Sequence, residues 1–198
     1  MAKLYYRHGA MGSSKSMNLI ATAHNYEDQG KSVLVLTSDK DNRSKPNKVE
    51  SRANMEWPAV PMTGEENLLE LMLIVKKRTI ETGKPVSCVL VDECQLFPEG
   101  FIDVLSDLVD TVEIPVICYG LRTDYMGRLF PSSKRLFEVA DKIEEVKTTC
   151  YVCNRKAIMN LRVNSEGESV KEGEQIIIGD DGYFPVCRVH YHLGIPTE

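Results

Sequence analysis

The chain has 198 residues, of which 42% are hydrophobic and 27% charged, a composition that predicts one or two compact units and argues against intrinsic disorder. With 24 lysines and arginines against 29 aspartates and glutamates, the formal net charge is −5, which disfavours a dedicated nucleic-acid surface because such surfaces need clustered positive charge. The sequence holds no apolar run long enough to cross a bilayer. We therefore expect a cytoplasmic protein that binds neither nucleic acid nor membrane.

Predicted strands and helices alternate from residue 1 to about residue 146. The apolar runs of the strands are continuous, as is typical of strands covered on both faces, and the intervening helices indicate a parallel α/β sheet. The predicted strands span residues 3–8, 32–37, 86–92 and 114–119. The predicted helices span residues 16–29, 65–82 and 100–108. Residues 39–63 are polar, contain three prolines and are predicted to form a long loop that is functional or mobile.

The turn after the first predicted strand carries a phosphate-binding pattern. Residues 9–16, GAMGSSKS, fit G-x-x-x-x-G-K-[ST] at every fixed position except 14, where serine replaces glycine. In such a loop the backbone N–H groups converge on phosphate oxygens, Lys15 pairs with the β- and γ-phosphates, and the Ser16 hydroxyl binds Mg²⁺. If position 14 requires a positive φ, serine costs roughly 1 kcal/mol relative to glycine. The alternative is a Ser/Gly turn that caps an ordinary helix.

Acidic residues follow two of the predicted strands. Asp92 and Glu93 end the third strand, at the edge where α/β sheets bind ligands, and Asp92 could assist a magnesium ion. Because successive strand residues point to opposite sides, Glu93 need not share that role and could act as a general base. Asp41 and Arg43 follow the second strand and could approach magnesium and a phosphate, although a hydrophilic turn explains them equally well.

The C-terminal part contains a metal-binding pattern. Cys150 and Cys153 form one knuckle, and Cys187 and His190 form a second. Three thiolates and one imidazole complete a tetrahedral zinc site with no open position, as a structural zinc requires. Chance spacing of reduced cysteines is the alternative, and His192 could compete with His190 as the ligand.

A domain boundary is predicted near residue 147. It separates a P-loop nucleotide-binding domain (1–146) from a small zinc-ribbon-like lobe (147–198). The lobe carries six lysines and arginines and seven acidic residues, so nucleic-acid binding is disfavoured here too. A lobe of about fifty residues is too small to be reliably stable on its own core, which favours zinc as a staple.

In this order and spacing, the motifs resemble the thymidine kinase family, in its zinc-containing bacterial form. The resemblance spans nearly the whole chain. It rests on GAMGSSKS (9–16), DNR (41–43), VLVDECQLF (89–97), YGLRTDYMGRLF (119–130), CYVC (150–153) and GEQIIIGDDGYFPVCRVHY (173–191).

The resemblance implies transfer of the γ-phosphoryl group of ATP to the 5′-hydroxyl of thymidine, giving dTMP in nucleotide salvage, with Glu93 as the catalytic base. Deoxyuridine is expected to be accepted too, because a pocket discriminates one missing methyl by only about 1–3 kcal/mol. The ATP-binding residues implied are Gly9, Ala10, Met11, Gly12, Ser13, Ser14, Lys15, Ser16, Asp41, Arg43, Asp92, Glu93, Cys94 and Gln95. The thymidine-binding residues implied are Met11, Leu121, Thr123, Tyr125, Phe130, Ile178, Gly179 and Tyr183. The resemblance also implies Mg²⁺ with the ATP, a homotetramer and feedback inhibition by dTTP.

Within this resemblance, residues 178–183 match a lasso that closes over thymidine between the zinc knuckles, although an Ile-Gly-Gly start is usual there. Two other functions stay open on the residues alone. In a P-loop ATPase, Glu93 would activate water. In a non-catalytic zinc-ribbon binding module, the P-loop would be degenerate, as Ser14 suggests. Tyr125 and Phe130 could equally be core residues.

Overall fold

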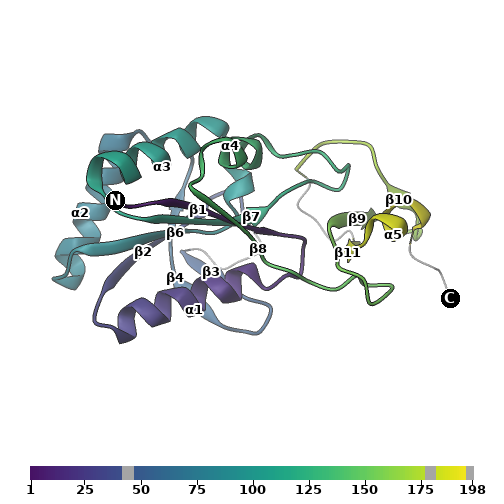
Figure 1. The fold of residues 1–198 in the computed structure, drawn as a ribbon, viewed down its shortest axis with the longest axis horizontal. Helices are drawn as coiled ribbons and strands as arrows, with labels where there is room; N and C mark the ends of the chain where they lie inside the picture. The colour runs from purple at the N-terminus through teal and green to yellow at the C-terminus, as the bar shows by residue number, and fades with distance from the viewer. Residues whose placement is uncertain (42–46, 177–181, 195–198) are drawn as a thin grey trace.

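The computed structural model describes residues 1–41, 47–176 and 182–194 (Figure 1). The largest sheet in these ranges contains β1 (Leu4–Gly9), β2 (Ser32–Ser38), β5 (Val60–Met62), β6 (Val86–Val91), β7 (Val116–Leu121) and β8 (Lys142–Glu145). These strands are all parallel, in the order β5-β2-β6-β7-β1-β8. The predicted parallel α/β fold is therefore confirmed, and the carboxyl ends of β1 and β6 meet at one edge of the sheet.

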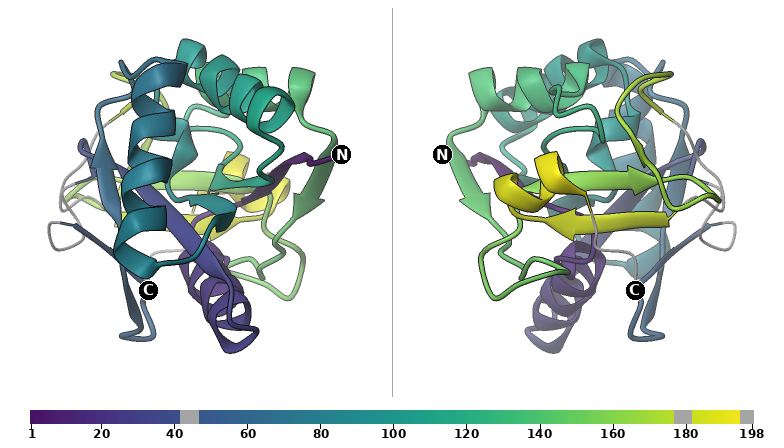
Figure 2. Two further views of the ribbon diagram at one scale, coloured as in Figure 1. Left: turned by 90° about the vertical axis from the view of Figure 1, so that its left-hand side faces the viewer. Right: turned by 90° about the vertical axis from the view of Figure 1, so that its right-hand side faces the viewer.

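Helices cover both faces of this sheet. They are α1 (Lys15–Asp28), α2 (Leu68–Thr82), α3 (Glu99–Val112) and α4 (Pro131–Val139). Figures 1 and 2 show α2, α3 and α4 on one face and α1 on the other. Strand residues alternate between two apolar cores, so that Leu34 and Leu36 of β2 lie in the core with α2 to α4, and Val33 and Val35 lie in the core with α1. A central strand such as β2 therefore needs an unbroken apolar run.

The start of α2 lies three residues after the predicted one because Asn67 caps it. The Oδ1 atom of Asn67 accepts hydrogen bonds from the backbone N–H groups of Leu69 and Glu70 at 2.9 and 3.1 Å. The Glu70 carboxylate in turn accepts one from the N–H of Asn67 at 2.9 Å. This reciprocal pair is a capping box, which satisfies backbone donors that have no partner within the helix.

The prediction of a loop over residues 39–63 is wrong for part of this range. The structure forms β3 (Lys48–Glu50) and β4 (Glu56–Pro58) as an antiparallel hairpin, followed by β5 at the edge of the main sheet. Val49 and Trp57 are paired across the hairpin, buried in the α1 core. These strands have three residues each, too few for a periodic pattern, and Pro61 in β5 is tolerated because an edge strand has one unpaired side.

Two elements between residues 131 and 145 carry no sequence prediction. Helix α4 begins with Pro131 at its first position, and Ser132 and Ser133 are buried within it, so its inner face is not an apolar stripe. Strand β8 lies at the opposite edge of the sheet from β5 and is charged except for Ile143, which is exposed. Periodicity detects neither pattern, because both elements depend on contacts with the rest of the fold.

The C-terminal part forms a second, smaller sheet beyond the carboxyl ends of the main strands (Figure 1). It consists of β9 (Met159–Val163), β10 (Ser169–Val170) and β11 (Gly182–Val186) in the antiparallel order β10-β9-β11, followed by α5 (Arg188–Leu193). Its own apolar core is built around Leu161, Val186 and Tyr191. The domain boundary near residue 147 stays a prediction. Of the helices in the described ranges, none is long and apolar enough to span a membrane.

Candidate functional site

The turn between β1 and α1 has the backbone of an anion-binding loop. Gly12 and Ser14 both adopt a positive φ, of 69° and 61°, so position 14 does require the conformation that favours glycine. The side chain of Ser14 makes no capping hydrogen bond to α1. At Gly9 an added Cβ would lie 2.5 Å from the backbone carbonyl oxygen of Val146 and 2.4 Å from Oγ of Ser13, so only glycine fits at this position.

Lys15 lies in the first turn of α1 and is buried, with 7% of its surface exposed. Its Nζ atom donates a hydrogen bond to the carbonyl oxygen of Ala10 at 3.1 Å and lies 3.5 Å from Oγ of Ser13. The ammonium group is thus held against the loop, at the positive end of α1. This is the position from which a lysine pairs with a phosphate.

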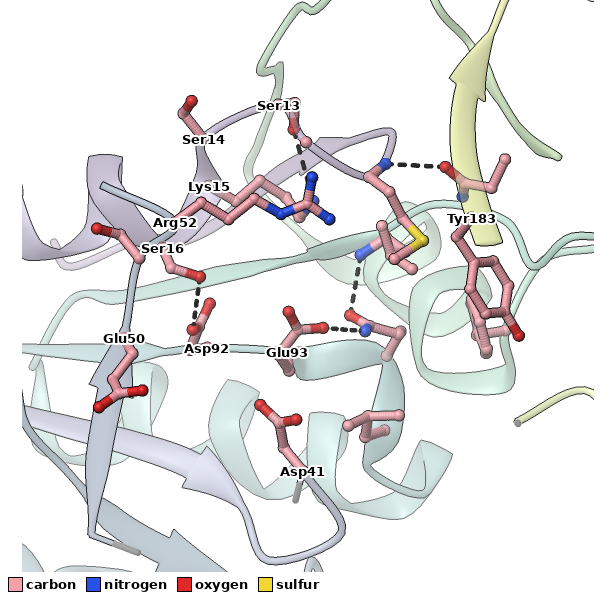
Figure 3. Close-up of a pocket in the computed structure, with 18 of the residues that line it drawn as sticks. Ser13, Ser14, Lys15, Ser16, Asp41, Glu50, Arg52, Asp92, Glu93 and Tyr183 are labelled. Atoms are coloured by element: carbon pink, nitrogen blue, oxygen red, sulfur yellow. Dashed lines mark hydrogen bonds between the residues drawn. The ribbon is translucent and has the colours of Figure 1, made fainter. Parts of the chain in front are cut away.

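Asp92 follows β6 and contacts the first turn of α1. Its Oδ2 atom accepts a 2.9 Å hydrogen bond from the Ser16 hydroxyl (Figure 3). Its Oδ1 atom is buried and has no hydrogen-bond partner in the part of the chain that the structure describes. A hydroxyl beside a carboxylate with one unsatisfied buried oxygen is a donor set that fits a magnesium ion.

Glu93 adopts a left-handed backbone, with φ at 48°, a strained conformation for a residue with a side chain. Gln95 holds its carboxylate: the Gln95 amide donates a hydrogen bond to Oε2 of Glu93, and Oε1 of Gln95 accepts one from the N–H of Leu121 at 2.9 Å. Gly120 permits this approach, because an added Cβ would lie 2.6 Å from Oε1 of Gln95. Glu93 is thus held at the carboxyl edge of the sheet, where a ligand can reach it.

These groups meet in a cavity of about 800 Å³, large enough for a nucleotide and a second small molecule. Most of the predicted site residues within the described ranges line it, whereas Gly9, Ala10, Thr123 and Cys94 do not. The predicted residues that line it are Met11, Gly12, Ser13, Ser14, Lys15, Ser16, Asp41, Asp92, Glu93, Gln95, Leu121, Tyr125, Phe130 and Tyr183. Cys94 lies in the core with no exposed surface. Arg43, Ile178 and Gly179 lie outside the described residues.

Sequence reasoning missed ten residues that line this cavity. They are Met17, Glu50, Ser51, Arg52, Ala53, Leu96, Asp124, Asn160, Gln175 and Ile176. Asn160, on β9, is 3% exposed and contacts the main domain on both sides. Its Oδ1 atom accepts a 2.8 Å hydrogen bond from the N–H of Met11, and its Nδ2 donates one to the carbonyl of Thr123 at 2.9 Å. The only sequence signal for Asn160 was a polar residue within an otherwise apolar strand segment, since a polar group that becomes buried needs hydrogen-bond partners.

The segment before the predicted lasso is fastened to the rim of the cavity. The Tyr125 hydroxyl lies 2.9 Å from the carbonyl oxygen of Glu174, to which it donates a hydrogen bond. The Gln175 amide donates to Oδ2 of Asp124 at 2.8 Å. Tyr125 and Tyr183 meet edge to face, with ring centroids 6.3 Å apart. Aromatic rings from both parts of the chain therefore border the cavity beside Glu93.

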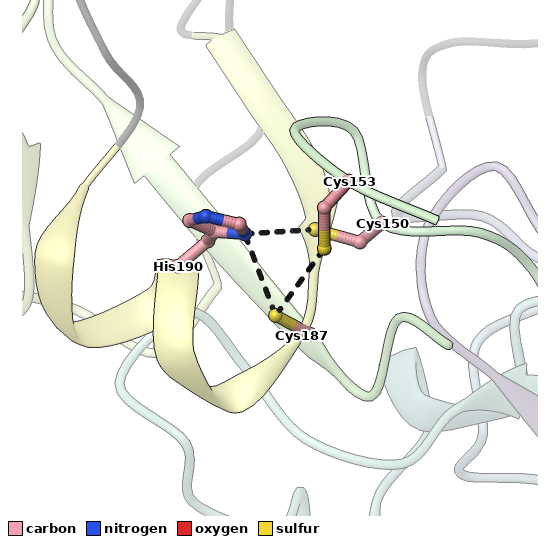
Figure 4. Close-up of side chains that lie close together, drawn as sticks. All are labelled: Cys150, Cys153, Cys187 and His190. Atoms are coloured by element: carbon pink, nitrogen blue, oxygen red, sulfur yellow. Dashed lines mark hydrogen bonds between the residues drawn. The ribbon is translucent and has the colours of Figure 1, made fainter. Parts of the chain in front are cut away.

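The four predicted zinc ligands come together (Figure 4). All four ligand atoms lie within 4.8 Å of one another. The Nδ1 atom of His190 is 3.4 Å from Sγ of both Cys150 and Cys187, and Sγ of Cys153 is 4.0 Å from that of Cys187. Tetrahedral zinc with ordinary bond lengths separates S and N by about 3.6 Å and two sulfurs by about 3.8 Å, so the cluster fits this ion.

The Cys150 thiol is also suited to a metal. Burial opposes its ionisation, but hydrogen bonds from the backbone of Cys187, Val152 and Cys153 and from His190 outweigh burial and lower the pKa of Cys150 to about 6. A thiolate is the form that binds zinc. His192, the competing candidate, lies outside the cluster.

Comparison with known proteins identifies relatives of nearly the whole chain. The family model "Thymidine kinase" matches residues 2–191. A thymidine kinase of Lactiplantibacillus plantarum is 46% identical over 192 residues, covering 96% of each chain, and one of Lactobacillus johnsonii is 44% identical over 193 residues, also 96% of each. A thymidine kinase of Francisella tularensis is 40% identical over 202 residues, covering 98% of this chain and 99% of its own.

Proposed function

Because this chain belongs to the thymidine kinase family, we propose that it transfers the γ-phosphoryl group of ATP to the 5′-hydroxyl of thymidine and releases ADP and dTMP. The observation that carries this proposal is that Lys15, Glu93 and Tyr183 line one cavity. A phosphate-binding loop, a candidate base and aromatic walls lie together, as transfer from a triphosphate to a nucleoside requires.

ATP binds with its phosphates on residues 9–16, and Lys15 neutralises part of their charge. Ser16 and Asp92 would hold Mg²⁺; the buried, unsatisfied Oδ1 of Asp92 supports this assignment. The ion would offset part of the negative charge of the phosphates. The orientation of the triphosphate thus depends on the first turn of α1 and the end of β6.

Glu93 accepts the proton of the 5′-hydroxyl as its oxygen attacks the γ-phosphorus. The hydrogen bond from Gln95 fixes the direction of the carboxylate, and through Gln95 that direction is tied to Leu121 at the end of β7. Orientation is what a general base needs first, because proton transfer requires hydrogen-bond contact with the nucleophile.

Thymidine binds on the other side of Glu93. Its base packs among Met11, Leu121, Tyr125, Phe130 and Tyr183, and we expect deoxyuridine to be a second substrate. Thr123 contributes indirectly, because its carbonyl oxygen accepts a hydrogen bond from Asn160, which lines the cavity. Ile178 and Gly179 complete the proposed set of thymidine-binding residues. Zinc at Cys150, Cys153, Cys187 and His190 would be structural, because the four ligands leave no open position.

We also propose cytoplasmic location, a homotetrameric assembly and inhibition by the end product dTTP. The first is supported by the six cysteines, all of them free, as in a reducing compartment. The homotetramer and the inhibition by dTTP are supported by family membership.

The test is a transfer assay with γ-labelled ATP and Mg²⁺ across the common ribo- and deoxyribonucleosides. We expect label on thymidine and deoxyuridine, and none on purine nucleosides. ATP hydrolysis that is indifferent to every nucleoside would instead favour a P-loop ATPase. An absence of ATP binding would favour a non-catalytic zinc-ribbon module.

A further inference from the structure

The hairpin of β3 and β4 has no role in the function proposed above, yet its turn lines the cavity with Ser51, Arg52 and Ala53. Arg52 extends toward the P-loop (Figure 3). Its Nη1 atom lies 3.5 Å from the position that a Cβ on Gly12 would occupy. The guanidinium group therefore lies over the anion-binding loop, on the side that faces the cavity.

The hairpin is anchored, so that Arg52 is presented from a defined place. Val49 and Trp57 are buried at its base, and the Trp57 ring meets His24 of α1 edge to face at 4.5 Å. The turn itself is closed by hydrogen bonds from the N–H of Ser51 to the carbonyl of Met55 at 2.8 Å and from the N–H of Met55 to Oγ of Ser51 at 3.2 Å. Because the backbone that carries Arg52 is already fixed, binding of an anion costs less conformational entropy.

The charges around the cavity leave a role for this arginine. Five carboxylates line it, at Asp41, Glu50, Asp92, Glu93 and Asp124, whereas Lys15 and Arg52 are its only cationic side chains in the part of the chain that the structure describes. Arg52 forms no ion pair with any described carboxylate. A triphosphate adds further negative charge, so a cavity of this composition needs its second cation at the phosphates.

We propose that Arg52 is a catalytic residue that contacts the γ-phosphoryl group of bound ATP and stabilises it during transfer. This inference rests on the proposed function. As the bond between the 5′-oxygen and the γ-phosphorus forms and the bond to the ADP oxygen breaks, the hydroxyl proton goes to Glu93. Arg52 keeps its own protons and donates hydrogen bonds to non-bridging γ-oxygens, where the planar guanidinium can engage two oxygens at once.

The experiment compares Arg52→Ala and Arg52→Lys with Lys48→Ala. Lys48 is a matched control, because it is a cation of the same hairpin whose Nζ pairs with Glu56 at 2.5 Å and does not line the cavity. For each protein we would measure kcat, both KM values, and the affinities for ADP and for the imido analogue of ATP.

We expect Arg52→Ala to lower kcat by about 10³-fold, the lower end of arginine contributions to phosphoryl transfer. It should weaken the imido analogue at least fivefold while ADP affinity and the KM for thymidine stay within twofold. Arg52→Lys should be intermediate, guanidinium ion should partly restore Arg52→Ala, and Lys48→Ala should behave like the wild type.

Three results would overturn the assignment: unchanged kcat in Arg52→Ala, equal weakening of ADP and the analogue, or a matching loss in Lys48→Ala. If the wild-type protein transfers phosphate to thymidine, the proposed function stands even when the role of Arg52 is refuted. If the wild-type protein shows no transfer, both the proposed function and the role of Arg52 are refuted.

Discussion

The hydroxyl of Ser16 donates a 2.9 Å hydrogen bond to Oδ2 of Asp92 and thereby joins the first turn of α1 to the end of β6. Burial, and then the charge of Glu93, raise the pKa of Asp92 to about 7, while the Ser16 hydrogen bond and the charge of Lys15 oppose this rise. In the protein without nucleotide, Asp92 therefore takes up a proton on folding.

This uptake predicts a pH dependence of stability. The ordinary pKa of the carboxyl is 3.8. The contribution of this protonation to stability is therefore complete below about pH 4 and is lost as the pH rises through about 7. We expect the stability of the wild type to fall relative to Asp92→Asn between pH 5 and pH 8, because asparagine does not titrate and its amide oxygen can still accept from Ser16. Urea unfolding midpoints at the two pH values measure this, and parallel curves for the two proteins would contradict it.

Ser14→Gly should preserve activity. It relieves a left-handed backbone that costs about 1 kcal/mol or more, against which glycine adds some entropy to the unfolded chain. We expect the free energy of unfolding to rise by up to about 1 kcal/mol, measured by denaturant titration. Glu113→Gly, at a φ of 57° after α3, is the control remote from the cavity. A large loss of kcat in Ser14→Gly alone would reveal a role for the serine hydroxyl.

His190 belongs to the zinc cluster, whereas His192, two residues further along the chain, does not. His190→Asn should be purified with less than one zinc per chain, unfold at a lower temperature and bind thymidine more weakly, because metal binding contributes to folding free energy. His192→Asn should retain one zinc and behave like the wild type. Metal analysis and thermal unfolding check both, and full zinc content in His190→Asn would remove that residue from the ligand set.

Asn160→Leu should disturb both substrates. The substitution keeps the volume but leaves the N–H of Met11 and the carbonyl of Thr123 without their partner, a loss of about 1–3 kcal/mol for each group that stays unsatisfied. We expect KM to rise for ATP and thymidine together, with partial recovery in Asn160→Asp, which keeps the acceptor toward Met11. Asn164→Ala is the control, since that side chain bonds to the backbone of its own loop. If both leucine and alanine variants have wild-type KM values, Asn160 has no positioning role.

The features that could be predicted from sequence depend on residues close together along the chain. The β2 pattern of consecutive apolar residues, the P-loop spacing up to Lys15, and the cysteine knuckle at Cys150 each lie within a few residues. The sequence leaves a positive φ at position 14 as a condition, and the structure meets it within the same short loop.

The features that could not be predicted depend on tertiary contacts. Arg52 reaches Gly12 only because the short β3–β4 hairpin folds back on α1. Asn160 reaches Met11 across 149 residues of chain. No local sequence pattern marks either residue, so the polar residues of the site could not all be predicted from the sequence.

The central claim is that Glu93 takes the proton of the nucleoside hydroxyl, and single-turnover transfer from γ-labelled ATP to thymidine by Glu93→Gln tests it most directly. The variant should bind ATP and thymidine with affinities close to those of the wild type, and transfer should slow by about 10²-fold or more, while Glu113→Gln transfers at the wild-type rate. Transfer by Glu93→Gln at the wild-type rate would contradict the account.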